Sequence, residues 1–374
     1  MPARLRIHAP AGTLKGLVDR HPSLVGMSSS ELALFLGERS DARWRGKQIA
    51  AWVYGRATSS FGDMTDLPHA LRETLAERAV VNPLTVERHL RSTDDVDKLL
   101  VHGGDGEVFE CVLLPYPDRV SCCISSQVGC PMGCTFCATG LGGFDRNLSV
   151  GEIVGQYLLL QGLSERRVSH VVFMGMGEPL LNLQNVVKSL KLLHEEVGLS
   201  YRHLTVSTVG LVPQIYELAD MGLPIHLALS LHSPRDEVRS RLMPVNHRWP
   251  VREVLSAMRA YQRATGRKIT IEYLLIDGLN DTVEQADELA QLLQGVPSFV
   301  NVIPFNHVDT IQGYARPSRA NVRAFKAALE KRGVSVAERV ERGHDIAAAC
   351  GQLAGEHTGR FARRAASAAL PLRS

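Results

Sequence analysis

The 374-residue sequence predicts an α/β protein, a partial (β/α)6 barrel preceded by a small helical domain. From residue 120 onward, short runs rich in Val and Ile alternate with longer amphipathic segments. Strand, helix and strand repeated in this way imply parallel pairing through right-handed crossovers. A doubly wound open sheet has the same periodicity and is the alternative fold. In both folds a ligand binds where the loops at the carboxyl ends of the strands meet.

Seven apolar runs supply the predicted strands of the barrel, and the amphipathic segments between them supply its helices. The runs are SCCISSQV, VSHVVFMG, HLTVSTVG, IHLALSLHS, KITIEYLLI, FVNVIPFN and VSVAERV. The helical segments include GEIVGQYLLLQGL, VREVLSAMRAYQRATG and RANVRAFKAALEKRG. Strand and helix therefore alternate through six full units.

Before the barrel, residues 1–90 are predicted to form a helical accessory domain. SSELALFLGE places a serine cap ahead of an acidic first turn, and RGKQIAAWVYGRA has apolar residues at helical spacing. Residues 91–119 are predicted to be a connecting β segment, because a DG turn separates two apolar alternations at about 96–114. The barrel is expected over residues 120–350. The tail, 351–374, is expected to be disordered at its end, where it carries four arginines and no acidic residue.

The composition is that of a globular protein, which we expect in the cytoplasm. No apolar run approaches the roughly 18 residues of a membrane helix, and the N-terminus shows no secretory pattern. Seven cysteines are an odd number in a long chain, which favours free thiols, metal ligands or catalysis in a reducing compartment. The net charge is only +3, but residues 1–60 hold nine Lys and Arg against four acidic residues. That asymmetry fits either a surface that faces a polyanion or an ordinary solvated basic face.

Three cysteines have the spacing C-x3-C-x2-C, namely Cys130, Cys134 and Cys137. They follow the first predicted strand of the barrel, where a site is expected. Structural zinc normally takes four ligands in paired C-x2-C knuckles, and the chain has no second knuckle. Three protein thiolates leave one coordination position open, which in a 4Fe-4S cluster lets one iron bind a substrate or cosubstrate.

With Phe136 before its last cysteine, this motif resembles the signature of the radical S-adenosylmethionine (SAM) superfamily. The resemblance implies a 4Fe-4S cluster held by Cys130, Cys134 and Cys137, with the amino and carboxylate groups of SAM on the open iron. It also implies that one electron from the cluster cleaves SAM to methionine and a 5′-deoxyadenosyl radical. A zinc site or a set of inert thiols is the alternative interpretation.

Later strand ends carry residues that resemble SAM-binding positions. GMGEP follows the next predicted strand, and its Gly177 and Glu178 resemble the superfamily motif that binds the SAM amino group. Glycines there let a ligand approach the backbone, and Glu178 can accept hydrogen bonds from an ammonium group. Each further candidate would on its own more often be a cap or turn residue. These candidates are Ser207, Ser230, Leu231, His232 and Asn306.

The full set of motifs is similar to the RlmN-type family of RNA (adenine-carbon-2) methyltransferases. CISSQVGC, GFDRNLSVGEIVGQ, FMGMGEPLLN, LTVSTVGLVP, LALSLH, RLMPVN and DIAAACGQL carry this resemblance from about residue 30 to 355. RWRGKQIAAWVY and FGDMTDLP match the family's helical accessory domain. The implied reaction methylates carbon 2 of an adenosine in the peptidyl-transferase region of 23S rRNA and of an adenosine beside the tRNA anticodon.

The resemblance also gives roles to residues outside the cluster motif. Cys350 is implied to take a methyl group from one SAM, to lose a hydrogen atom from it to a radical made from a second SAM, and to bond the RNA. Glu110 is implied to remove the carbon-2 proton as general base, and Cys123 to release the product through a transient disulfide with Cys350. Because Cys122 and Cys123 are adjacent on a predicted strand, only one of them can face the barrel mouth. Cys111 and the outward member of the pair are expected to be small buried hydrophobes.

RNA is the implied partner, with a reducing electron donor such as flavodoxin, and the chain is expected to act as a monomer. The target adenosine must be single-stranded, looped or flipped out, because a stacked base does not expose carbon 2. Arg43, Arg45 and Lys47, with Trp44 among them, are candidate phosphate contacts on the helical domain. The alternative is a capped surface helix with Trp44 in the core of that domain.

Two other functions are compatible with these motifs. The sister Cfr-type group methylates carbon 8 of the same ribosomal adenosine and confers antibiotic resistance. GMGEPLLN favours the carbon-2 group, whereas Ser233 after SLH resembles the sister group. A non-catalytic iron–sulfur electron carrier or RNA-binding module is the alternative from another class, and it gives Glu110, Cys123 and Cys350 no reason to occur together.

Overall fold

A computed structural model describes residues 21–306, 311 and 313–353. Its main feature is one ten-stranded sheet with the strand order β1-β2-β3-β4-β7-β8-β9-β10-β11-β12. A separate two-stranded sheet pairs β5 with β6. The predicted disorder at the end of the tail concerns residues outside the described ranges.

Seven parallel strands form the barrel part of the large sheet. They are β4 (Val120–Cys123), β7 (Val168–Phe173), β8 (Leu204–Thr208), β9 (His226–Ser230), β10 (Ile269–Leu275), β11 (Ser298–Pro304) and β12 (Val336–Glu338). Each pairs with the next of these in the chain, so the strand order never reverses. A doubly wound sheet requires such a reversal. The predicted α/β barrel is therefore confirmed, and the doubly wound alternative is excluded.

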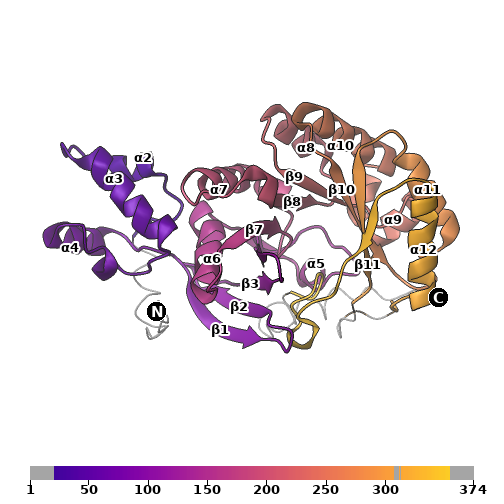
Figure 1. The fold of residues 1–374 in the computed structure, drawn as a ribbon, viewed down its shortest axis with the longest axis horizontal. Coiled ribbons are helices and arrows are strands. Elements are labelled where there is room, and N and C mark those ends of the chain that lie inside the picture. The colour runs from indigo at the N-terminus through magenta and orange to yellow at the C-terminus, as the bar shows by residue number, and fades with distance from the viewer. Residues whose placement is uncertain (1–20, 307–310, 312, 354–374) are drawn as a thin grey trace.

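Helices cover the outside of the parallel strands (Figure 1). The longer ones are α6 (Val150–Leu163), α7 (Leu183–Glu195), α8 (Val212–Asp220), α10 (Val251–Thr265), α11 (Val283–Leu292) and α12 (Arg319–Lys331). In α10, Val254, Met258 and Tyr261 recur at helical spacing and are fully buried, so they form the side of the helix that faces the sheet. The three helical segments named from the sequence are α6, α10 and α12.

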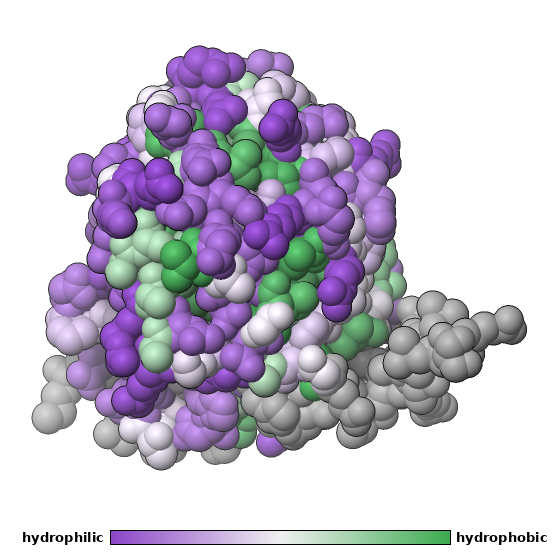
Figure 2. All heavy atoms as spheres, turned by 90° about the vertical axis from the view of Figure 1, so that its right-hand side faces the viewer, coloured by the Kyte–Doolittle hydropathy of each residue, from purple (hydrophilic) through white to green (hydrophobic). Residues whose placement is uncertain are grey.

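The outer surface over the last helices is mainly polar. Figure 2, which views the molecule from the side of α11 and α12, shows hydrophilic residues over most of this face, with apolar residues scattered among them. Within the described ranges, no helix combines the length and apolar character needed to cross a membrane.

Three antiparallel strands extend the sheet before the barrel. They are β1 (Thr85–Arg91), β2 (Asp97–His102) and β3 (Val108–Pro115), and β3 pairs with β4. The predicted strands at about 96–114 are confirmed as β2 and β3, with Gly106 of the DG turn at φ +80°. β1 corrects the prediction, because its residues lie in the range expected to be helical. TVERHLR carries no strong helical stripe, and pairing with β2 satisfies its backbone.

The N-terminal helices form a small unit beside the barrel (Figure 1). It contains α2 (Ser29–Phe35), α3 (Ala42–Ala50), a π-helical turn η1 (Ala51–Gly55), a 3-10 turn η2 (Phe61–Asp63) and α4 (His69–Arg78). The sequence predicts a serine cap within SSELALFLGE, which starts at Ser29, but the cap of α2 is Ser28, one residue earlier. Its hydroxyl accepts a hydrogen bond from the backbone N–H of Glu31.

Trp44 on α3 is 56% exposed, so the alternative that placed it in the core of the helical unit is wrong. Arg43 and Lys47 are also exposed. Arg45 is engaged within the unit, since its Nε lies 3.0 Å from Oδ2 of Asp41 and its guanidinium lies 4.3 Å from the centroid of the Trp44 ring. Of the candidate RNA contacts, Arg43, Trp44 and Lys47 therefore face the solvent.

Short elements connect the strands and helices. They are β5 (Gln127–Gly129), α5 (Ala138–Gly142), β6 (Phe144–Asn147), η3 (Pro179–Asn182), η4 (Tyr201–His203), α9 (Asp236–Leu242), η5 (Pro244–His247) and η6 (His344–Ile346). The run SCCISSQV, predicted as one strand, is divided into β4 and β5. At the division, the Gln156 side chain accepts from the backbone N–H of Ser125 at 2.8 Å and donates to its carbonyl oxygen at 3.0 Å. A side chain thus replaces the strand partner there.

Candidate active site

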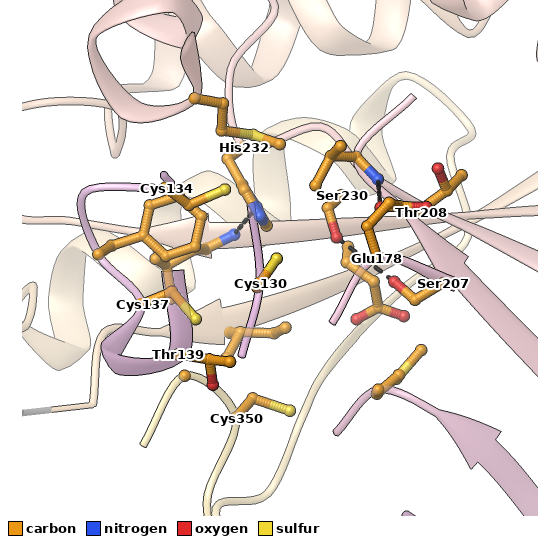
Figure 3. Close-up of a pocket in the computed structure, with 18 of the residues that line it drawn as sticks. Cys130, Cys134, Cys137, Thr139, Glu178, Ser207, Thr208, Ser230, His232 and Cys350 are labelled. Atoms are coloured by element: carbon orange, nitrogen blue, oxygen red, sulfur yellow. Dashed lines mark hydrogen bonds between the residues drawn. The ribbon is translucent and has the colours of Figure 1, made fainter. Parts of the chain in front are cut away.

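A cavity of about 160 Å³ lies at the carboxyl ends of the parallel strands. Its wall comes from the cysteine motif, from the ends of β7 to β11 and from the C-terminal loop. Figure 3 shows Cys130, Cys134 and Cys137 on one side of this space and Glu178, Ser207 and Ser230 on the other. This is the end of the barrel at which a ligand site was expected.

A close backbone contact shapes the loop of the three motif cysteines. Gly129 ends β5 with φ +75°, and a Cβ atom there would lie 2.1 Å from the carbonyl oxygen of Gly143. The backbone N–H of Cys130 donates to the same oxygen at 2.7 Å. Cys137 then precedes α5. The chain therefore turns tightly between β5 and β6 and keeps the three thiols around one cavity.

The GMGEP turn brings Glu178 into the cavity wall. Gly177 has φ +102°, and a Cβ atom there would lie 2.6 Å from Cβ of Gln127, so this glycine lets the turn pack on β5. The Glu178 carboxylate accepts the backbone N–H groups of Val209 at 2.8 Å and Leu180 at 3.0 Å. Burial raises the pKa of Glu178 to about 7. A cation beside this carboxylate would favour its ionised form. Glu178 is therefore suited to bind an ammonium group.

Ser207, Ser230 and Asn306 line the same cavity. The hydroxyl oxygens of Ser207 and Ser230 are 3.4 Å apart, at the ends of the neighbouring strands β8 and β9. The Asn306 amide oxygen lies 3.4 Å from Nη1 of Arg316, so Asn306 also has a partner on the rim. Parallel pairing in chain order therefore gathers these predicted contacts into one wall.

His232 lines the cavity, whereas the side chain of Leu231 is buried in the core and does not. Nδ1 of His232 accepts the backbone N–H of Leu274 at 3.0 Å. Burial, with the nearby charge of Arg239, lowers the pKa of His232 to about 3, so its ring is neutral. Any contribution of Leu231 to ligand binding would come from its backbone.

Cys350 lines the main cavity and also an adjoining hollow, which it shares with Cys123. Sheet register explains the position of Cys123, because it pairs with Val112 of β3 and the two side chains share one face of the sheet. Cys122 points to the opposite face. Cys122 and Cys111 are fully buried in the core, as predicted for the outward member of the pair and for Cys111.

Arg339 lines both the main cavity and the adjoining hollow, and no motif points to it from the sequence. Its Nη1 lies 3.6 Å from Sδ of Met174 and 3.9 Å from Oε2 of Glu272. The charge of a Cys350 thiolate raises the pKa of Arg339, and the charges of Glu272 and Cys123 add to this effect. The only sequence signal is a charged residue within the last predicted strand run, VSVAERV.

Glu110 is not part of the cavity wall in the described part of the chain. It lies on β3, on the same sheet face as Val112 and Cys123. Its side chain is 3% exposed, and Oε1 lies 3.2 Å from Nζ of Lys98 on β2, which is 2% exposed. Glu110 is thus one half of a buried ion pair on the sheet face that carries Cys123.

Known proteins share these features over most of the chain. Residues 124–293 match the model of the Radical SAM superfamily, and residues 23–81 match that of the ribosomal RNA large subunit methyltransferase N-terminal domain. A probable dual-specificity RNA methyltransferase RlmN from Symbiobacterium thermophilum is 46% identical over 355 residues, which cover 93% of this chain and 95% of that protein. This chain belongs to the RlmN family of radical SAM enzymes.

Another RlmN relative and a solved structure agree with this membership. The protein of the same name from Bacillus subtilis is 44% identical over 344 residues, covering 91% of this chain and 94% of that protein. The crystal structure of a radical SAM methyltransferase from Sphaerobacter thermophilus has a TM-score of 0.86 at 42% identity, covering 90% of this chain and 100% of that one. The chain is accordingly a radical SAM methyltransferase.

Membership in the radical SAM superfamily implies a 4Fe-4S cluster and SAM, and the three motif thiols fit a cluster. Within the described ranges, no three His, Cys, Asp or Glu side chains converge on a point that would hold a single metal ion. A cluster needs thiols around a space instead, because each thiolate binds a different iron. The sulfur atoms of Cys130, Cys134 and Cys137 border such a space (Figure 3). Burial raises the pKa of all three thiols, to about 12 for Cys130, so iron binding must displace their protons.

Proposed function

We propose that this chain methylates carbon 2 of an adenosine in RNA, through an S-methylcysteine at Cys350 and a transient disulfide between Cys350 and Cys123. The observation that carries the proposal is the position of Cys350. It lines the cavity of the three cluster cysteines and also the hollow that contains Cys123. A thiol there is accessible to SAM on one side and to the resolving thiol on the other. The RNA substrate is supported by the relatives, which are named probable dual-specificity RNA methyltransferases.

A 4Fe-4S cluster held by Cys130, Cys134 and Cys137 would supply the electron that cleaves SAM to a radical. Cys350 takes a methyl group from one SAM as a thiolate, the nucleophilic form of the side chain, and S-adenosylhomocysteine leaves. Arg339 lines the same cavity and the same hollow. A second SAM is the radical source, so each turnover uses two. Once the methyl carbon has lost a hydrogen atom and bonded to the adenine ring, Cys350 tethers the RNA, and the adduct gives up one electron, which the oxidised cluster would take back. Glu110 accepts the carbon-2 proton. Cys123 loses its proton and attacks the Cys350 sulfur, so that an S–S bond forms as the C–S bond breaks and the released carbon takes a proton to become the methyl group.

The position of Glu110 supports its role as the base. Glu110 and Val112 are two residues apart on β3, so their side chains share one face of the sheet. Val112 pairs directly with Cys123. Lys98 is the counter-ion of the Glu110 carboxylate at 3.2 Å. The base and the resolving thiol therefore lie on one face of the sheet, with Cys123 in the hollow that Cys350 also lines.

The proposed substrates are an adenosine in the peptidyl-transferase region of 23S rRNA and an adenosine beside the tRNA anticodon. Exposed Arg43 and Lys47 offer phosphate contacts, and exposed Trp44 offers a ring on which a base can stack. We further propose a reductant such as flavodoxin, a monomeric enzyme and a cytoplasmic location, as the family resemblance implies.

Carbon 8 of the same ring is the alternative target. Ser233 is the residue that resembles the carbon-8 group, but it is absent from the cavity wall in the described part of the chain. Its hydroxyl accepts the backbone N–H of Arg235 at 3.0 Å and donates to the carbonyl oxygen of Arg235 at 3.1 Å. This local turn accounts for the serine, so Ser233 does not favour carbon 8.

Mass spectrometry of nucleosides tests the proposed function. Ribosomal and transfer RNA that lack the modification are incubated with cluster-loaded enzyme, SAM and a reductant, then digested and compared with authentic methyladenosines. We expect 2-methyladenosine. The appearance of 8-methyladenosine would contradict the proposed ring position. The absence of any methyladenosine, with SAM cleavage intact, would contradict RNA methylation itself.

A further inference from the structure

The turn between β1 and β2 is hydrogen-bonded to the loop that leads to Cys350, although the two segments are separated by about 250 residues of sequence. Nε of Arg342 donates to Oδ2 of Asp94 at 2.5 Å, and the backbone N–H of Gly343 donates to Oδ1 of Asp94 at 3.1 Å. The backbone N–H of Thr93 donates to Oδ2 of Asp345 at 2.9 Å. Figure 1 shows the ends of β1 and β2 beside the yellow C-terminal segment. We call residues 93–98 and their contacts with residues 342–347 the hairpin clamp.

Close packing between the two segments adds to these hydrogen bonds. Gly343 has φ +66°, and a Cβ atom there would lie 2.9 Å from Cγ1 of Val96 and 2.9 Å from Cβ of Ala348. Only a glycine fits between the hairpin and the returning chain without displacing one of them. The hairpin turn and the loop are therefore packed as well as hydrogen-bonded.

Lys98 forms the inner part of the hairpin clamp. Its ammonium group pairs with Oε1 of Glu110 at 3.2 Å and donates to the carbonyl oxygen of Ala347 at 3.3 Å. Ala347 has φ +49°, a conformation uncommon for a residue other than glycine, and lies three residues before Cys350. A buried ammonium needs partners for its N–H groups, so Lys98 joins the carboxylate of β3 to the backbone of the Cys350 loop.

We propose that the hairpin clamp sets the position of Cys350 beside Cys123, with Lys98 as its inner positioning residue and Asp94 as its outer one. This inference rests on the proposed roles of the two cysteines. Neither Lys98 nor Asp94 belongs to the cavity wall in the described chain, so each acts through the loop. The hairpin of β1 and β2 thereby has a part in the reaction, because it positions the loop whose thiol carries the methyl group.

Disulfide formation between Cys123 and Cys350 measures this positioning without RNA or turnover. The cluster-loaded, full-length enzyme, shown by peptide mass to have an unmethylated Cys350, is treated with the thiol oxidant diamide. Two thiols lose two protons and two electrons to form one disulfide, and diamide is reduced to its hydrazine. Peptide mass spectrometry follows the Cys123–Cys350 pair with time. We expect Lys98→Met to slow its formation by about tenfold, because small misplacements of reacting groups have large effects on rate.

Four further variants complete the test. Asp94→Asn, on the surface, should also slow disulfide formation, while Lys98→Arg, which keeps a cation and its donors, should be faster than Lys98→Met. Lys98→Met leaves the Glu110 charge buried without its partner, which can prevent folding. In that case Lys98→Met/Glu110→Gln, which removes both charges of the pair, replaces it and should also form the disulfide slowly. Lys188→Met removes the ion pair with Glu31, 2.6 Å long and remote from the clamp, and should match the wild type.

The outcomes separate this inference from the proposed function. Wild-type rates in the folded Lys98 variants and in Asp94→Asn would overturn the hairpin clamp and leave the roles of the cysteines intact. A wild-type enzyme that forms no Cys123–Cys350 disulfide would contradict the resolving pair itself, and the inference with it. Slow formation in the clamp variants, with rescue by Lys98→Arg and a normal rate in Lys188→Met, supports it.

Discussion

Cys122 and Cys123 are adjacent and chemically identical, yet the sheet sends their side chains to opposite faces. Cys122 is buried in the apolar core, whereas Cys123 lines the hollow beside Cys350. The sequence predicts that only one of them faces the barrel mouth, since alternate strand residues point to opposite faces. Which one does so depends on the register with β3, where Val112 pairs with Cys123. Register is set by the partner strand, so from the residues alone the choice stays open.

Glu178 yields a prediction about SAM binding. Glu178→Gln keeps an oxygen that can accept a backbone N–H group but removes the negative charge. We expect SAM to bind about ten- to a hundredfold more weakly, because a hydrogen bond to a charged group contributes about 1.5–3 kcal/mol. Equilibrium dialysis with the cluster-loaded variant measures the change. Glu284→Gln makes the same substitution on an exposed residue of α11 and is the control. Equal affinities in the two variants would show that Glu178 does not hold the ammonium group.

The same carboxylate predicts a pH dependence. Burial raises the pKa of Glu178 from 4.5 to about 7, so the ligand-free fold disfavours its ionised form. A folded-state pKa above the unfolded one means that the free energy of unfolding falls as the pH rises through this interval. SAM binding should strengthen over the same interval, as the carboxylate becomes charged. Unfolding of wild type and Glu178→Gln at several pH values checks this, and equal slopes would contradict it.

At the scale of elements, α2 and α3 pack closely at Gly46. A Cβ atom there would lie 2.5 Å from the carbonyl oxygen of Ser29 and 2.8 Å from the backbone nitrogen of Ala33. We expect Gly46→Ala to destabilise the helical unit by about 1–3 kcal/mol, because the two helices must separate. Gly55 on η1 has no atom within 4 Å of such a Cβ, so Gly55→Ala should be neutral or stabilising by about 0.4–1 kcal/mol. Thermal unfolding followed by circular dichroism compares them, and equal stability would refute the close packing.

The elements themselves are largely predictable, because helical stripes and apolar runs are local signals. The exceptions depend on distant partners. β1 is a strand only because β2 pairs with it. The run SCCISSQV divides because the side chain of Gln156 takes both backbone groups of Ser125. Neither partner can be identified from the local pattern, so these boundaries were beyond sequence reasoning.

At the scale of the whole molecule, the barrel topology brings residues that are distant in sequence into one site. Ser207, Ser230 and Asn306 line one cavity because parallel strands in chain order bring their carboxyl ends together. This part of the site follows from the predicted fold class. Lys98 does not, because its contact with Ala347 spans 249 residues and crosses from the antiparallel extension to the C-terminal loop. Arg339 is likewise recognisable only once both cavities are seen.

The helical unit yields a prediction about RNA binding. Trp44→Ala removes an exposed ring, and we expect RNA affinity to fall by about 1–3 kcal/mol, the contribution of one stacked base. SAM cleavage without RNA should not change, because α3 contributes no residue to the cavity wall. Fluorescence anisotropy with labelled tRNA measures the affinity. Tyr216→Ala removes an exposed aromatic ring from α8 and is the control. Unchanged affinity in Trp44→Ala would remove this face of α3 from the RNA interface.

The account as a whole depends on Cys350 carrying the methyl group and Cys123 releasing the product. The most direct test is the covalent RNA–protein adduct formed by Cys123→Ala, located by peptide mass spectrometry in enzyme with full cluster content. We predict that this variant loads a methyl group and accumulates RNA on Cys350, that Cys350→Ala does neither, and that Cys122→Ala turns over without an adduct. A Cys123→Ala enzyme that forms no adduct, or forms one at another residue, would contradict the account.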